Sequence, residues 1–162
     1  MKFNNKGQTL IEAIVALAFA AIVISAIAMV IITSLDNASF SKYQNLATHY
    51  AQEGIDIMRQ KGETDWGTFS ALEGNTYCLG QSTSTLQAEG TCTDNPNITN
   101  TIGLIRKISV DTGVGCNSFG KKVSVTVYWA DGKCKDTSNK YCHRVTLDSC
   151  IAQINNSTIP GP

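Results

Sequence analysis

The sequence lacks the short motifs that usually mark an active site. It has no GxSxG nucleophile motif, no HExxH metal-binding motif, no glycine-rich phosphate loop and no cysteine–histidine nucleophile pattern. The two histidines, His49 and His143, have no neighbour in the sequence that would make either a catalytic base. We therefore expect a non-enzymatic protein with no catalytic residue and no cofactor.

The chain also lacks net charge. Lysines and arginines number 13 and aspartates and glutamates number 13, so bulk charge gives no attraction to nucleic acid or acidic lipid. The distribution is uneven. Residues 36–94 carry eight acidic and three basic side chains, whereas residues 104–144 carry three acidic and eight basic ones, namely Arg106, Lys107, Lys121, Lys122, Lys133, Lys135, Lys140 and Arg144. These eight are candidates for contact with DNA or with another subunit, and we favour a solvated surface or a subunit contact over DNA.

Cysteine is absent from the first 77 residues, and no CxxC pair occurs anywhere in the chain. All six cysteines lie in the second half, and six is an even number. This spacing argues against a structural zinc site, and we expect no metal. Three disulfides, formed in an oxidising compartment, explain the pattern better.

Glycine and proline are missing between Gln8 and Glu53, so nothing in this stretch interrupts a helix. Within it, the 20 residues Ala13–Ile32 contain one polar side chain, Ser25. A helix of about 20 residues at about 1.5 Å per residue spans the hydrocarbon core of a bilayer. We predict one helix from Gln8 to Gln60.

This predicted helix has two halves of different character. Residues 8–35 form a transmembrane or filament-core half, and Lys2 and Lys6 before it place the N-terminus in the cytoplasm by the positive-inside rule. Residues 36–60 form an amphipathic half whose apolar stripe should pack on a folded domain outside the membrane. The stripe consists of Tyr43, Leu46, Ala47, Tyr50, Gly54, Ile57 and Met58.

The start of the helix carries a specific motif, a basic leader followed by Gly7, Gln8 and the string Thr9-Leu10-Ile11-Glu12. This motif resembles the cleavage and methylation site of type IV prepilins. The resemblance implies that residues 1–7 are a leader, that a prepilin peptidase cuts between Gly7 and Gln8, and that the new amine of Gln8 is methylated. It also implies that Glu12 guides the subunit into a filament. Gln8 stands where the family usually has an aromatic residue.

Residues 61–155 are predicted to form an outer β-domain, followed by a tail at 156–162. The region 61–100 has scattered apolar residues and should be a long connection with short strands, one of them at Tyr77–Leu79. Three later segments alternate apolar and polar residues and should form an antiparallel meander over the helix stripe, namely Leu104–Asp111, Lys121–Trp129 and His143–Cys150.

The predicted meander also suggests how the cysteines pair. Cys134 and Cys142 bracket the loop between two antiparallel strands, so they should join at one end of the hairpin. Cys116 precedes the first of these strands and Cys150 ends the second, so they should join at the other end. Cys78 and Cys92 remain to close the connecting region.

The later part of the chain resembles the PilV type of minor pilin, and it is also similar to pseudopilins of type II secretion. The likeness rests on Ala51–Arg59, Arg106, the strand that ends in Trp129 and the strand that begins at Arg144. It implies an α+β, disulfide-stapled fold in which a long N-terminal helix packs on a small antiparallel sheet.

The likeness also implies a structural role in a pilus-like filament. The implied partners are a prepilin peptidase, other pilin subunits, an inner-membrane assembly platform and the membrane itself. The location would be the inner membrane, with the outer domain outside, and then an extracellular or periplasmic filament. A secretion pseudopilin, a tip subunit that binds DNA during uptake, and an anchored domain without a filament stay open as alternatives.

Overall fold

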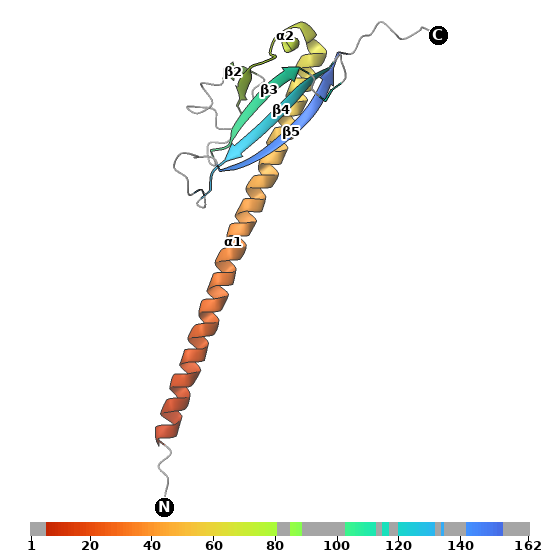
Figure 1. The fold of residues 1–162 in the computed structure, drawn as a ribbon. Helices are drawn as coiled ribbons and strands as arrows, with labels where there is room; N and C mark the ends of the chain where they lie inside the picture. The colour runs from red at the N-terminus through yellow and green to blue at the C-terminus, as the bar shows by residue number, and fades with distance from the viewer. Residues whose placement is uncertain are drawn as a thin grey trace, which may run out of the picture. The chain divides into compact units, whose positions relative to one another are not determined.

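The computed structural model describes residues 6–80, 85–88, 103–112, 115–116, 120–131, 134 and 142–153. The chain forms two compact units, Met1–Ser41 and Lys42–Pro162, and each is described by itself. The described residues form two helices and one sheet, in which every neighbouring pair of strands is antiparallel (Figure 1). The α+β class predicted from the sequence is therefore present, with a long apolar helix at the N-terminus.

Helix α1 runs over Lys6–Thr64, slightly beyond the predicted range at both ends. Its hydroxyl side chains are accommodated because they bond back to the helix itself, as Ser25 Oγ does to the carbonyl of Ala21 at 2.8 Å. The helix ends before Asp65, which caps the short helix α2 (Trp66–Ser70) by accepting a hydrogen bond from the Thr68 amide at 3.1 Å. Helix α2 was not predicted, although Asp65 is a typical N-cap residue.

In the part of the chain that the structure describes, the sheet has five strands, β1 (Thr76–Leu79), β2 (Leu86–Ala88), β3 (Ile105–Thr112), β4 (Gly120–Trp129) and β5 (His143–Ala152). Their order across the sheet is β2-β1-β3-β4-β5. The meander β3-β4-β5 is the one predicted from alternation, and β1 matches the predicted short strand closely. The position of strand β2, a further short strand in the region 61–100, was not predicted, because three residues are too few for a periodic pattern to show. The sheet is therefore wider than the three-stranded meander.

The inner face of the sheet forms the core of the second unit. Val123, Val125, Val127 and Trp129 alternate along β4, and each is at most 1% exposed. The part of α1 within this unit covers this face. A Cβ atom added at Gly54 would lie 2.9 Å from Val125 Cγ1, so glycine allows the helix to approach the sheet closely.

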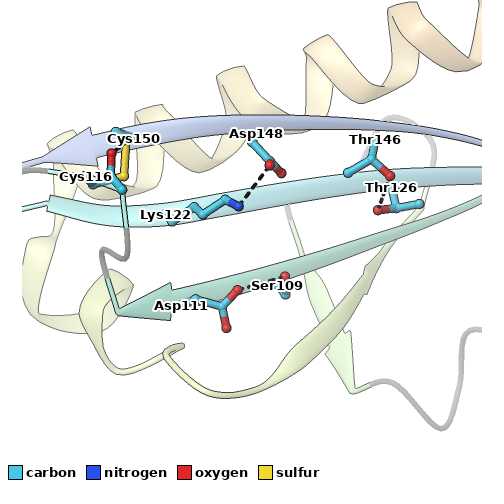
Figure 2. Close-up of polar contacts among 9 residues, drawn as sticks. Ser109, Asp111, Cys116, Lys122, Thr126, Thr146, Asp148 and Cys150 are labelled. Atoms are coloured by element: carbon cyan, nitrogen blue, oxygen red, sulfur yellow. Dashed lines mark hydrogen bonds and ion pairs between the residues drawn. A yellow bond between two sulfur atoms is a disulfide. The ribbon is translucent and has the colours of Figure 1, made fainter.

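Polar side chains line the opposite face of the sheet (Figure 2). There Lys122 Nζ lies 2.9 Å from a carboxylate oxygen of Asp148, and the hydroxyls of Thr126 and Thr146 lie 3.0 Å apart. These cross-strand pairs join β4 to β5, as expected for residues directly or diagonally opposite in an antiparallel pair. The alternation predicted from the sequence therefore separates a core face from a polar face.

Candidate functional site

The first unit presents a continuous apolar helix surface, which we call the apolar segment, Leu10–Leu35. Its fifteen large apolar side chains are between 47% and 72% exposed. Met29, Val30, Ile31 and Ile32 are consecutive and therefore cover a full helical turn, so the surface is apolar on all sides. Such a helix needs lipid or apolar partners around it.

By length and composition, α1 meets the requirements of a membrane span. An 18-residue window in it has a mean hydropathy of 3.0, and none of that window is buried within the protein. Among the described residues, it is the one helix that does so. A single N-terminal span is therefore compatible with the chain.

The residues of the prepilin-like motif lie at the start of α1. Gly7 and Gln8 are within its first turn, and the side chain of Glu12 is exposed. Between Lys6 and Asp36, Glu12 is the only charged residue. A carboxylate in such a surface needs a counter-charge or a hydrogen-bond donor once apolar groups surround it.

Arg106 does not belong to an exposed basic face, which corrects the expectation from charge alone. Its side chain is fully buried on the inner face of the sheet. The guanidinium donates to the carbonyls of Leu79 at 3.2 Å, Tyr50 at 2.9 Å and Gly80 at 2.8 Å. We call this arrangement the Arg106 clasp. It joins α1, β3 and the end of β1.

Glu53 completes the Arg106 clasp with an ion pair, in which its carboxylate lies 3.5 Å from a guanidinium nitrogen. Burial lowers the pKa of Arg106, and the negative charge of Glu53 opposes that change. An arginine side chain nevertheless stays protonated at physiological pH. The buried charge is thus satisfied within the protein and has no accessible group left for DNA.

Two of the other basic candidates are matched by acids of the same chain. Lys121 forms an ion pair with Glu73, and Lys122 pairs with Asp148. Lys107 Nζ lies 5.9 Å from the centre of the Tyr128 ring, and Arg144 is exposed. Lys133, Lys135 and Lys140 lie outside the described residues.

The polar face of the sheet consequently has little net charge. In the register of β3, β4 and β5 it carries Lys107, Lys122 and Arg144 together with Asp111 and Asp148, a balance of three positive and two negative charges. The acidic part of the chain supplies partners for Arg106 and Lys121 through Glu53 and Glu73. Three of the basic candidates, Arg106, Lys121 and Lys122, thus pair with acids of the same chain, which weakens the case for DNA contact.

Two disulfides join the pairs expected from the meander. Cys116 is bonded to Cys150 at one end of β4 and β5, and Cys134 to Cys142 at the other, with Cα atoms 5.7 Å and 5.5 Å apart (Figure 2 shows the first). Cys78 is also in a disulfide and is buried. Cys92, its expected partner, lies outside the described residues.

The end of the β4–β5 hairpin holds a cluster that sequence reasoning missed. Asp131, Cys134, Cys142 and His143 each offer a potential ligand atom, and these four atoms all lie within 4.8 Å of one another. Asp131 and Cys134 precede the hairpin loop and Cys142 and His143 follow it, so strand pairing brings the two halves together. The usual sequence signal of such a metal-binding cluster is a closely spaced C-x-x-C pair, and the sequence contains none.

No protein-family model, curated protein or solved structure significantly matches the chain.

Proposed function

We propose that the chain is a structural, non-enzymatic subunit of a type IV pilin-like filament, anchored by its N-terminal helix before assembly. The observation that carries this proposal is the apolar segment Leu10–Leu35, which is exposed on all sides and follows a prepilin-like motif. A membrane could cover this surface in a lone subunit, and the helices of neighbouring subunits could cover it in a filament.

Glu12 gives the proposal its specific mechanism. In a lone subunit the carboxylate lies close to one end of the apolar segment and can reach the polar interface. Once helices pack around it, the carboxylate needs a counter-charge, and the amine released at Gln8 of a neighbouring subunit would supply one. A carboxylate and an amine about 4 Å apart attract by roughly 4 kcal/mol at an effective dielectric of about 20, before the cost of desolvation.

The second unit supports an extracytoplasmic role. Its disulfides fit an oxidising compartment. The part of α1 in this unit packs on the inner face of the sheet, through Tyr50 and Gly54. The sheet is therefore attached to the helix that would enter the filament. A pilus and a type II secretion pseudopilus would both use this arrangement, and the proposal covers either filament.

Substitution of Glu12 tests the proposal. Glu12→Ala and Glu12→Gln should insert in the membrane as the wild type does but enter filaments less, since both remove the charge. A net loss of about 1.4 kcal/mol would lower incorporation about tenfold. Ser25→Ala is a matched control, because Ser25 lies in the same segment and its hydroxyl donates a hydrogen bond to the Ala21 carbonyl of its own helix. Equal incorporation of all variants at matched membrane levels would contradict the assembly role of Glu12.

A further inference from the structure

We infer that the end of the β4–β5 hairpin is a redox-controlled binding site for a zinc ion. The site would consist of Asp131, Cys134, Cys142 and His143, and it would form only when the Cys134–Cys142 disulfide is reduced to two thiols. This inference depends on the second unit alone, and in the oxidising compartment proposed for that unit the site would form only where a reductant is supplied.

The four ligand atoms already lie close together, and a tetrahedral arrangement requires the bonded sulfurs of Cys134 and Cys142 to separate after reduction. Zinc bound at about 2.0–2.3 Å to four ligands holds them about 3.3–3.8 Å from one another. The four atoms here lie within 4.8 Å of one another, and Cys134 Sγ is 3.8 Å from Asp131 Oδ1. The Cα atoms of the two cysteines are 5.5 Å apart, so the sulfurs can separate without a large movement of the strands.

The surroundings already orient the ligands. The His143 ring stacks on Trp129 with 5.3 Å between ring centres, and His143 Nε2 lies 3.0 Å from a carboxylate oxygen of Asp131. The Asp131 amide lies 3.4 Å from Cys134 Sγ, and the Cys134 amide donates to the Asp131 carbonyl at 3.1 Å. An N–H group directed at sulfur stabilises a thiolate. Fixed ligands of this kind raise the affinity of a metal site.

The chemistry of the ligand set selects the ion. Two thiolates, one imidazole and one carboxylate suit zinc, whereas calcium and magnesium prefer a set made of oxygen ligands alone. Cys142 is exposed, so a reductant can reach its sulfur. A dithiol reductant would attack the disulfide, pass two electrons and two protons to the cysteines and leave as its own disulfide. Zinc would then bind as the two thiols release their protons.

The zinc content of the full chain in detergent tests the inference. One sample is kept oxidised. The other is reduced with a phosphine, which is then removed in the absence of oxygen. The reduced chain should bind one zinc ion and the oxidised chain none. Cobalt in place of zinc should give the absorption of a tetrahedral site with thiolate ligands. Cys134→Ser with Cys142→Ser should abolish binding, whereas Cys116→Ser with Cys150→Ser should not.

The chain's two histidines provide a matched comparison that separates a built site from loose binding to thiols. His143→Ala and Asp131→Asn should each weaken zinc binding by at least about tenfold. His49→Ala should not, because His49 is exposed on α1, far along the chain from the hairpin. Absence of zinc from the reduced wild type, or equal affinity in His143→Ala and the wild type, would overturn the inference.

Discussion

Removal of the Arg106 guanidinium should strongly destabilise the second unit. Arg106→Met keeps much of the side-chain volume, so its effect reports mainly on lost hydrogen bonds and not on a cavity. It leaves the carbonyls of Leu79 and Gly80 without the donors that serve them now. A buried polar group that loses its partner costs about 1–3 kcal/mol. Because the bond to Gly80 is only partly buried, the two carbonyls together should cost about 2–4 kcal/mol.

The ion pair with Glu53 should add less to this cost. The Glu53 side chain is 35% exposed, so water can solvate its carboxylate when Arg106 is absent. We therefore expect Glu53→Gln to cost under about 1 kcal/mol, as partly exposed ion pairs do. The difference between the two variants would show that the buried carbonyls, more than the opposite charge, depend on Arg106.

Urea unfolding of the full chain in detergent measures both effects. Trp129 is 1% exposed in the core, so its fluorescence reports on the second unit. Arg106→Met should lower the midpoint by about 1–2 M, because the free energy of unfolding of a small domain changes by about 2 kcal/mol per molar urea. Arg144→Met, an exposed position on β5, is the control and should change stability by less than about 0.5 kcal/mol. Equal midpoints for Arg106→Met and Arg144→Met would refute the stabilising role of the Arg106 clasp.

Three further predictions concern the second unit. Gly54→Ala should lower the free energy of unfolding in urea by about 1–3 kcal/mol, because the new methyl group would collide with Val125 and Arg106. Gln60→Ala, on an exposed part of α1, is the control and should lower it little. Equal stability of the two variants would argue against a close approach of the helix to the sheet at Gly54. A peptide map without reduction should find Cys116 bonded to Cys150 and Cys134 to Cys142, and exchanged partners would contradict the strand register. Hydrogen bonds from Ser124, the larger effect, and from Lys122 lower the pKa of Asp148. The folded state therefore favours the charged carboxylate more than the unfolded state does. The resulting stabilisation is lost as the pH falls through about 4 and below. Asp148→Asn should therefore lose less stability than the wild type between pH 5 and pH 3, and identical losses would rule out this contribution.

The sequence predicted those parts of the fold that local patterns determine. The apolar run specifies α1, and strict alternation specifies β3, β4 and β5, because each side chain's environment repeats with the period of its element. The meander then placed Cys134 opposite Cys142 without any tertiary information. Helix α2 and the position of strand β2 escaped prediction because segments of five and three residues are too short to show a period.

The prediction that Arg106 belongs to an exposed basic face was wrong because it used the charge of the segment and not the face of the strand on which each residue lies. Arg106 shares the face of Ile108 and Val110, both fully buried, so alternation along β3 already placed it inside. Nothing local indicated that Tyr50, Leu79 and Gly80 would supply carbonyls to it, because these residues lie 26 to 56 positions away. The cluster of Asp131 and His143 at the hairpin end likewise depends on pairing between strands.

The intact mass of the protein extracted from membranes of cells with an active prepilin peptidase tests the central proposal most directly. We predict a chain that begins at Gln8 and has lost Met1–Gly7, with the mass of one added methyl group if its new amine is methylated. Loss of Lys2 and Lys6 would leave 11 basic and 13 acidic side chains, so isoelectric focusing provides an independent check. A protein that retains Met1 in such cells would contradict the proposal that this chain is a pilin-like filament subunit.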